Sequence, residues 1–336
     1  MMGPPEKIVA VTAPILLRVT TRRATDAEVA KWRDDGWVLL EGLVGTEKID
    51  ALTKDLRQIF PTAEELHADP EGVTERWIGH PVEPKEVFVW PDEGPGFRPD
   101  QQRWSAAFPF SGTGALNRIC VHPSIVDFAE RALGNIDIRL YQAHLTAKYA
   151  GVTDYEQPMH VDRNHSWLPA GSESPWWNLE GFLYLTDVTD DDNPTRLVTV
   201  PETAHIDSPY GVVMPNMEPG VYAAEQAAPG VRGSYLAYRS DCWHRGAPFG
   251  SATGARVVLA VAFKNAGTEW IGYDTQQSRS TGIEWTVFVE GSTPRELELF
   301  GWPPPGHPVW DKSLLERTQQ RYPELDLSPW QRALCG

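Results

Sequence analysis

The sequence predicts a mainly β protein in which a few early helices pack outside an antiparallel sandwich or barrel. One observation is that apolar residues at helical spacing come early, before about residue 134. Another is that many short β-branched runs follow, and that turns rich in Gly, Pro and Asp separate them. Early helices followed by many short strands are typical of a fold with an antiparallel β core and helices on its outside.

Three helices and one short strand are predicted in this early part. The first helix, 25–36, opens with a capping box and ends at a glycine, and a strand at 37–40 follows it. The second helix, 46–59, has apolar residues that step by three and four, and the third, 123–134, also ends at a glycine. Residues 67–114 show no sustained period, so we expect irregular structure there with short strands.

The predicted β core begins at residue 136. Side chains alternate from there to residue 149, and one face carries Leu140, Gln142, His144, Thr146 and Lys148, while Tyr141 belongs to the opposite, apolar face. Such a strand is expected where one side lines a site and the other packs on helices. Further strands are expected at about 158–163, 180–187, 196–200, 231–238, 243–247 and 256–264.

We expect the chain to have three parts. These are an N-terminal arm and helix at 1–35, a β domain with helical support at 36–265, and a C-terminal extension at 266–336 packed on the β domain. Within the extension, the β-branched stretch 285–289 is predicted to be one more strand and 314–322 a short helix. The extension could equally form a contact between two copies, so a monomer and a homodimer are both left open.

Composition limits the classes of partner. The chain has 336 residues and a formal net charge of -16, from 46 acidic and 30 basic residues. This balance repels phosphate backbones and anionic lipid surfaces, so neither nucleic acid nor a membrane is expected as a partner. It also weighs against a coenzyme A ester as substrate. Fourteen tryptophans, among them Trp167, suit a pocket for an apolar or ring-containing small molecule, although most aromatic side chains pack in cores or loops.

The sequence also indicates the compartment. It has no run of about 18 apolar residues that could cross a bilayer, and its start lacks the charged-then-apolar layout of a secretory signal. The three cysteines, Cys120, Cys242 and Cys335, are an odd number without close pairing, which fits a reducing environment. We therefore expect a soluble, cytoplasmic protein.

The stretch with the strongest chemical signal is Gln157-Pro-Met-His-Val-Asp-Arg-Asn-His165. On a strand, His160 and Asp162 point to the same face and can hold one metal ion between them. The third candidate ligand, His244, lies far downstream. Two histidines and one carboxylate, with the other coordination positions open, form the facial triad of non-haem Fe(II) oxygenases. A local cluster of His160, Asp162 and His165 is an alternative, but it requires a turn after Asp162 and leaves His244 without a role.

The motif is part of a longer pattern. Arg256 follows His244 by 12 residues, and between the two halves lie Phe182-Leu-Tyr-Leu-Thr-Asp-Val-Thr-Asp-Asp-Asp-Asn193 and Leu197-Val-Thr-Val-Pro-Glu-Thr-Ala-His205. This combination resembles the phytanoyl-CoA dioxygenase (PhyH) family of Fe(II)/2-oxoglutarate-dependent oxygenases. The sequence departs from the family pattern at Pro194, where glycine is usual, at 202–204, where the family has Gly-Ser, and at Phe182, a place often held by tryptophan. These departures affect the loop and leave the candidate ligands in place.

The resemblance implies a double-stranded β-helix, the jelly-roll or cupin-like barrel of that family, over roughly 36–265. It also implies Fe(II) and 2-oxoglutarate as cofactors and O2 as co-substrate. Such enzymes oxidise, and most often hydroxylate, a C-H bond of a small organic molecule and release succinate and CO2. Halogenases of the family have a small residue in place of the carboxylate, so Asp162 points away from that variant.

The remaining candidate residues follow from the same reading. A guanidinium grips a carboxylate with two parallel hydrogen bonds, which suits Arg256 to the distal carboxylate of 2-oxoglutarate. Arg245 is a nearer competitor, but an adjacent residue on a strand points away from the His244 face. Thr146 and His144 are candidates for other 2-oxoglutarate contacts, and Gln142 and Trp167 for substrate contacts.

One rival function uses the same barrel without oxidative chemistry. A cupin-like metal-binding isomerase or ligand-binding module would fit the fold, although cupins usually show His-X-His with a downstream glutamate, where this chain has His160-Val-Asp162. Binding of 2-oxoglutarate would separate the two readings.

Overall fold

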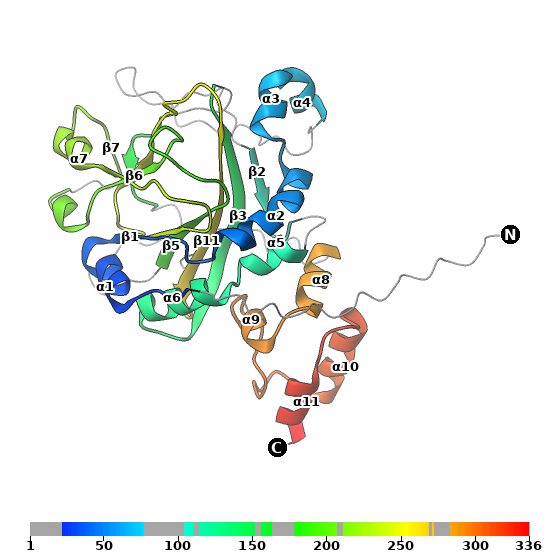
Figure 1. The fold of residues 1–336 in the computed structure, drawn as a ribbon. Helices are drawn as coiled ribbons and strands as arrows, with labels where there is room; N and C mark the ends of the chain where they lie inside the picture. The colour runs from blue at the N-terminus through cyan, green and yellow to red at the C-terminus, as the bar shows by residue number, and fades with distance from the viewer. Residues whose placement is uncertain are drawn as a thin grey trace.

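A computed structural model describes residues 22–76, 104–110, 114–151, 156–162, 178–206, 211–268, 271 and 283–335. Two antiparallel sheets form the centre of the molecule (Figure 1). The large sheet has the strand order β1-β9-β5-β11-β3-β2, and the small sheet has the order β7-β4-β10-β6-β8. The prediction of an antiparallel β core with helices outside it is therefore confirmed.

The strands of the two sheets interleave along the chain. The large sheet consists of β1 (Trp37–Leu40), β2 (Trp104–Ala107), β3 (Ile138–Tyr149), β5 (Asn178–Tyr184), β9 (Tyr235–Arg239) and β11 (Ala255–Asn265). The small sheet consists of β4 (Met159–His160), β6 (Thr195–Leu197), β7 (Val212–Val213), β8 (Gln226–Ala227) and β10 (His244–Gly246). Each predicted core strand has a counterpart among them, and several are shorter than expected.

The helices fall into three groups along the chain. The early group is α1 (Asp26–Asp35), α2 (Thr46–Ile59), α3 (Ala63–Ala68), α4 (Pro70–Arg76), α5 (Gly114–Ile119) and α6 (Pro123–Leu133). A short 3-10 turn, Pro201–Thr203, and α7 (Pro219–Ala224) lie within the β region. The C-terminal group is α8 (Ile283–Glu290), α9 (Pro294–Glu298), α10 (Lys312–Arg321) and α11 (Ser328–Cys335).

Local capping chemistry sets the early helix ends. The backbone N–H of Glu28 donates to the side chain of Thr25, and the backbone N–H of Thr25 donates to the carboxylate of Glu28, which completes the predicted capping box of α1. Gly36 ends α1 with φ of 87°, and Gly134 ends α6 with φ of 67°, conformations that glycine adopts without strain. The prediction missed α3 and α4, which lie in or beside the stretch expected to be irregular.

The early helices cover one face of the large sheet and the small sheet covers the other. One large apolar cluster joins α1, α2 and α6 to outward-facing strand residues such as Leu145, Leu183 and Leu259. A smaller cluster lies between the two sheets and includes Tyr184, Tyr238, Leu197 and Cys242. In Figure 1, β6 and β7 accordingly lie on one side of the large sheet, and α2 and α5 lie on the other. The inner face of the large sheet is therefore the face that meets the small sheet.

A bulge in β3 corrects the predicted alternation. The pairing of β3 with β11 shifts between Ala262 and Phe263, so that Tyr141 is the extra residue. As a result Leu140 joins the helix-side core, and Tyr141 turns to the inner face beside Ala262. The predicted faces of Leu140 and Tyr141 are thus wrong, because an extra residue reverses the alternation on one side of the bulge. From Gln142 to Lys148 the predicted polar face is correct.

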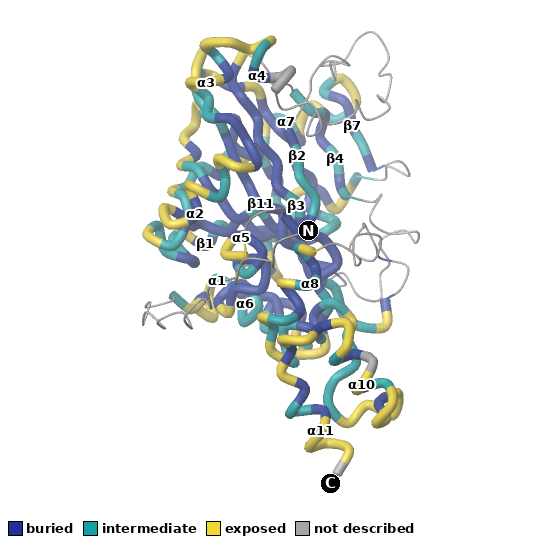
Figure 2. The backbone as a smooth tube through the Cα atoms, turned by 90° about the vertical axis from the view of Figure 1, so that its right-hand side faces the viewer, coloured by how far each residue is buried: buried dark blue, intermediate teal, exposed yellow. Residues whose placement is uncertain are grey.

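The C-terminal helices continue the helix-side core. Trp285, Phe288 and Val289 of α8 are buried, and Phe108, which follows β2, contacts Trp285 and Phe288 edge to face. The stretch 285–289 is therefore helical, and its prediction as a strand is wrong, since its bulky residues pack on one face of a helix. Figure 2 shows that the tube is mostly buried through the sheets and more exposed along α10 and α11.

Candidate metal centre

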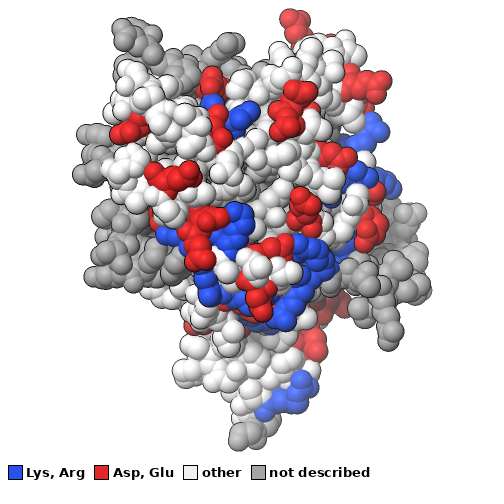
Figure 3. Space-filling view, turned by 60° about the vertical axis from the view of Figure 1, so that its left-hand side comes forward, with Lys and Arg blue, Asp and Glu red and all other residues white. Residues whose placement is uncertain are grey.

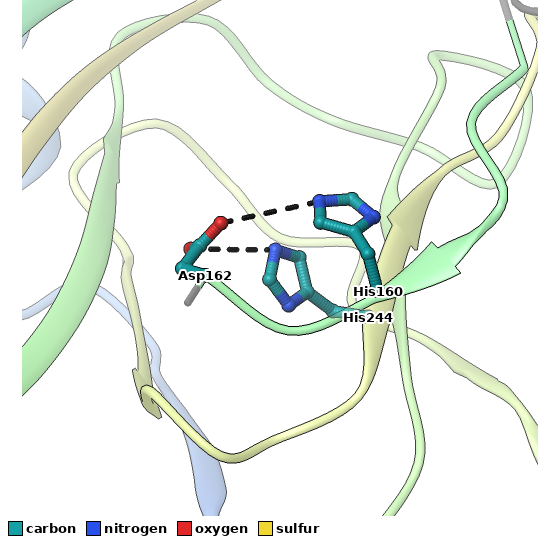
Figure 4. A group of neighbouring side chains, drawn as sticks. All are labelled: His160, Asp162 and His244. Atoms are coloured by element: carbon teal, nitrogen blue, oxygen red, sulfur yellow. Dashed lines mark ion pairs between the residues drawn. The ribbon is translucent and has the colours of Figure 1, made fainter. Parts of the chain in front are cut away.

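The three predicted ligands meet between the two sheets. His160 ends β4, Asp162 follows it by two residues, and His244 begins β10. The antiparallel pairing of β4 with β10 places His160 and His244 directly opposite each other. Their ligand atoms and those of Asp162 all lie within 4.8 Å of one another (Figure 4). The pairing of two distant segments therefore builds the cluster. His165, the alternative ligand, lies outside the described residues.

Both imidazoles are held with one nitrogen facing the carboxylate. The Nε2 atom of His160 lies 4.0 Å from Asp162 Oδ1, and that of His244 lies 3.5 Å from Asp162 Oδ2. The opposite nitrogens, Nδ1, hydrogen bond to the backbone carbonyls of Pro158 at 2.8 Å and Cys242 at 3.0 Å. A backbone partner on Nδ1 fixes the tautomer and the ring orientation that a metal ligand needs.

The electrostatic surroundings keep His160 in its metal-binding form. The pKa of His160 is lowered to about 4, chiefly by burial and next by the neighbouring His244, while Asp162 opposes the shift. A neutral imidazole is the form that coordinates a metal ion. Two imidazole nitrogens and one carboxylate oxygen are a donor set suited to a divalent transition metal. The residues of the cluster therefore fit a metal ion. The side chains of His160 and Asp162 are 21% and 16% exposed.

Tyr238 supports the carboxylate from the large sheet. Its hydroxyl donates to Asp162 Oδ2 at 2.9 Å, and its ring lies 4.6 Å from that of His244. Burial, followed by the charge of Asp162, raises the pKa of Tyr238 well above its usual value, so the hydroxyl keeps its proton. Tyr238 was not among the predicted site residues. Alternation along β9 was the available signal, since Tyr238 and Leu236 share the inner face.

Two buried cations lie beside each other further along the inner face. Arg256 on β11 and Lys148 on β3 are paired across the sheet, and they are 4% and 6% exposed. The Arg256 guanidinium donates to the backbone oxygen of Asn193 at 3.0 Å and to Thr195 Oγ1 at 2.7 Å, and it also lies over the Phe182 ring. These contacts hold the guanidinium on the inner face of the sheet.

Asn193 organises this cationic pair. It adopts a left-handed backbone with φ of 57°, and its side-chain oxygen accepts from Arg256 at 3.2 Å and from Lys148 Nζ at 3.4 Å. Its amide nitrogen donates to the carbonyl of Ala247. Asparagine tolerates this left-handed backbone conformation better than most residues. The next residue is Pro194. Neither Asn193 nor Lys148 was predicted to be functional, and a lysine is ordinarily assigned to the surface.

The other predicted site residues differ in where they lie. Gln142 and His144 share the inner face of β3 and contact each other at 3.3 Å, and Thr146 lies on the same face, 7% exposed. Arg245, the competitor of Arg256, is bound by Glu225 and Glu156. Trp167 lies outside the described residues.

An antiparallel two-sheet fold with helices on one face, and a cluster of two histidines and one aspartate between the sheets, defines a β protein with a candidate mononuclear metal site. No family model and no curated protein matches this chain. Solved structures do match it. The α-ketoglutarate-dependent carbocyclase SnoK from nogalamycin biosynthesis has a TM-score of 0.53 at 17% identity, over 77% of this chain and 92% of that one.

Two further structures have the same fold. EctD from S. alaskensis, solved in its apo form, has a TM-score of 0.51 at 15% identity, over 76% of this chain and 84% of that one. The epimerase SnoN, solved with Fe3+, α-ketoglutarate and nogalamycin RO, has a TM-score of 0.50 at 17% identity, over 72% of this chain and 83% of that one. At these identities the likeness establishes the fold that the chain shares with these enzymes.

Proposed function

We propose that this chain is an Fe(II)/2-oxoglutarate-dependent dioxygenase that oxidises a C-H bond of a small organic molecule, with hydroxylation as the outcome and succinate and CO2 as co-products. The observation that carries the proposal is the cluster of His160, Asp162 and His244 between the two sheets, together with the buried guanidinium of Arg256 on the inner face of the large sheet. Within the proposal, the two sheets are the halves of a double-stranded β-helix and the chain belongs to the PhyH family.

The metal would be held by the Nε2 atoms of His160 and His244 and by the carboxylate of Asp162. Three protein ligands leave up to three positions for 2-oxoglutarate and O2, and the bound metal supplies the activation of O2 in this class of enzyme. Because the carboxylate of Asp162 is present, the position that a halide needs is filled, and we propose an oxygenase rather than a halogenase. Tyr238 would hold that carboxylate in place through its 2.9 Å hydrogen bond.

The cationic pair would bind the far carboxylate of 2-oxoglutarate. Arg256 offers a planar guanidinium, which suits a carboxylate better than a point charge does. Lys148 lies beside it and adds a second positive charge to the same spot. In this pose the metal would compensate one negative charge of 2-oxoglutarate, and Arg256 with Lys148 would compensate the other. A buried anion requires such compensation. Thr146 and His144, on the same strand face as Lys148, are the proposed additional contacts.

Hydroxylation is the reaction outcome that we propose. The fold neighbours SnoK and SnoN are described as a carbocyclase and an epimerase, so this fold supports several outcomes. The outcome depends on which C-H bond is held beside the metal, and that is set by the loops around the pocket. For this chain we propose a free small molecule as substrate, not a coenzyme A ester, with Gln142 and Trp167 among its contacts.

The remaining parts of the proposal concern the protein as a whole. We propose a cytoplasmic enzyme, monomeric or homodimeric, in which residues 36–265 carry the reaction and 266–336 form an extension packed on them. Among the described residues, no helix is long and apolar enough to cross a membrane. On the face shown in Figure 3, acidic and basic side chains are intermingled. Ion pairs join some of the charged side chains of the described residues, as between Arg131 and both Asp26 and Asp127.

The test is anaerobic addition of Fe(II) and then 2-oxoglutarate to the protein, followed by a visible absorption scan. A metal-to-ligand charge-transfer band should appear on addition of 2-oxoglutarate. A metabolite pool should then be screened for compounds that increase succinate release. If the protein binds Fe(II) and calorimetry detects no binding of 2-oxoglutarate, the oxygenase proposal fails and the cupin-like binding module replaces it.

A further inference from the structure

A histidine and a lysine contact each other on the helix side of the molecule, outside the candidate metal centre. His122 is the N-cap of α6, and its side chain is buried, with the residue 4% exposed. Its Nε2 atom lies 2.8 Å from Nζ of Lys48, a half-buried residue in the first turn of α2. The contact joins the start of one helix to the start of another, and neither side chain has a role in the proposed oxygenase reaction.

The capping bond of α6 determines which nitrogen of His122 carries the proton. The Nδ1 atom accepts a hydrogen bond from the backbone N–H of Ser124 at 3.2 Å. In a neutral imidazole one nitrogen accepts and the other carries the proton. The proton of a neutral His122 is therefore on Nε2, the nitrogen that faces Lys48.

The surroundings of His122 keep the imidazole neutral. The pKa of His122 is lowered to about 4, chiefly by burial and next by the positive charge that Lys48 can carry. A doubly protonated ring would also lose the acceptor at Nδ1 that caps α6. At neutral pH the ring therefore has a single proton, which Nε2 donates.

The amine of Lys48 must then be the acceptor. An ammonium group has three donor hydrogens and no acceptor, whereas a neutral amine has a lone pair. The 2.8 Å contact between Nε2 of His122 and Nζ of Lys48 is thus a hydrogen bond only when Lys48 is neutral. A charged Lys48 would turn one donor toward another.

The position of Lys48 in the fold also disfavours its charged form. Burial lowers the pKa of Lys48, and the charge of the adjacent, exposed Glu47 opposes the shift. Lys48 lies in the first turn of α2 and beside the N-cap of α6, so the positive ends of two helix dipoles lie near its amine. Hydrogen bonding, burial and helix position therefore all favour the neutral amine.

We propose that Lys48, held as a neutral amine by His122, is a nucleophilic modification site that takes acyl groups from thioesters. The amine turns from His122 toward solvent and its lone pair attacks the thioester carbonyl. The C–S bond breaks, and the proton lost from nitrogen goes to the thiolate. The products are an amide at Lys48 and a free thiol.

A purely structural reading of the same contact makes a different prediction. In that reading the pair only joins α2 to α6, and Lys48 is an ammonium group like other lysines. An ammonium group has no lone pair and cannot attack a carbonyl. The two readings differ in the rate at which Lys48 reacts near neutral pH.

The test is acetylation of the full chain by the neutral thioester S-acetyl-N-acetylcysteamine, with peptide mass spectrometry to measure the rate at each lysine. Lys54, an exposed residue on the same helix, is the internal reference. At pH 7 only about one in 2,500 ordinary lysine side chains is neutral. Lys48 should react at least about tenfold faster than Lys54, which corresponds to a pKa lower by one unit. Its rate should also level off at a lower pH than the rate at Lys54.

Variants show whether His122 is responsible. His122→Asn removes the imidazole and keeps a residue that caps helices well, so Lys48 should regain its proton and react as slowly as Lys54. His307→Asn is the matched control, because the exposed His307 accepts in the same way from the backbone of Val309 at 3.2 Å. It should leave the rate at Lys48 unchanged. Circular dichroism shows whether each variant is folded.

Two results would overturn the proposal. One is that Lys48 and Lys54 of the wild type react at equal rates with the same dependence on pH, which would mean that Lys48 is charged. The other is a folded His122→Asn variant in which Lys48 still reacts fast. If His122→Asn does not fold, the two rates in the wild type and their dependence on pH decide the question alone.

Discussion

The geometry of single side chains determines how the candidate centre would hold a metal. His160, Asp162 and His244 offer one ligand atom each. Removing one of only three ligands should leave too few to retain a divalent ion, so His244→Ala should lose Fe(II) binding and 2-oxoglutarate turnover. Equilibrium dialysis under anaerobic conditions measures the metal. His205→Ala, whose side chain is 64% exposed beside Glu218, is the control and should bind one iron per chain. Stoichiometric iron in His244→Ala would disprove the triad.

Tyr238 should tune the metal centre without touching the metal. Tyr238→Phe keeps the ring that packs on His244 and removes the hydrogen bond to Asp162. Loss of a partner that orients a ligand typically weakens metal affinity by about ten- to a hundredfold. Competition with a chelator gives the affinity, and the position of the 2-oxoglutarate charge-transfer band reports the changed carboxylate. An unchanged affinity together with an unchanged band would show that Tyr238 only fills space.

Arg256 should act on the co-substrate and leave the metal alone. Arg256→Lys keeps the positive charge and loses the planar fork, so 2-oxoglutarate should bind about ten- to a hundredfold more weakly, in line with one hydrogen bond to a charged group. Iron binding should be nearly unchanged. Arg196→Lys is the control, since Arg196 lies on β6 with its side chain 31% exposed near Glu225. Equal losses of iron and 2-oxoglutarate in Arg256→Lys would indicate general disruption instead.

Single residues could be placed together from the sequence where the signal is local. His160 and Asp162 are two residues apart and lie in one cluster, although β4 ends at His160 and Asp162 lies beyond the strand. Lys148 was missed as a functional candidate because its burial depends on which strands become neighbours, and charged residues are rarely buried. Tyr141 was assigned to the wrong face because the bulge opposite Ala262 and Phe263 arises from the pairing of two distant strands.

Strand packing around Gly181 makes a prediction at the level of elements. Gly181 lies in the middle of β5, and a Cβ atom added there would lie 2.1 Å from the hydroxyl of Tyr235. Tyr235 is fully buried and its hydroxyl donates to Val261 on the far side of β5, so the ring has little room to move. Gly181→Ala should therefore lower the free energy of unfolding by about 1–3 kcal/mol, as overpacking does.

Denaturant unfolding followed by circular dichroism measures this change. Gly220→Ala in α7 is the matched control, because nothing lies within 4 Å of a Cβ added there. It should be neutral or slightly stabilising, since alanine favours a helix over glycine. If Gly181→Ala unfolds at the same denaturant concentration as the wild type, β5 and β9 accommodate the added methyl group without loss of stability.

Among the helices, α1, whose capping residues can be recognised in the sequence, was predicted correctly. The helix α1 has a capping box and a terminal glycine, and both were read from the sequence. The Trp285-Thr-Val-Phe-Val289 stretch of α8, in contrast, favours a strand by composition. Its contacts with Phe108 and Phe300 favour a helix, and tertiary packing of this kind overrides local propensity.

Over the whole molecule, the C-terminal extension and the β core share one apolar cluster. Residues of α8, α9, α10 and α11 belong to the same cluster as the helix side of the large sheet. Arg118 of α5 strengthens the junction, since it pairs with Glu296 at 2.6 Å and lies over the Phe288 ring. A shared core predicts that the extension and the β core unfold together rather than as two independent units.

Phe288 tests this cooperativity. Phe288→Ala removes a ring that is 2% exposed and contacts Phe108 and Phe300, so the whole protein should lose about 3–5 kcal/mol of stability. Val287→Ala on the same helix is the control, because Val287 is 53% exposed and should change stability little. Unfolding followed by circular dichroism and by loss of bound metal should coincide in both variants. If Phe288→Ala instead unfolds in two steps and retains metal after the first, the extension is a separate unit and the β core is stable without it.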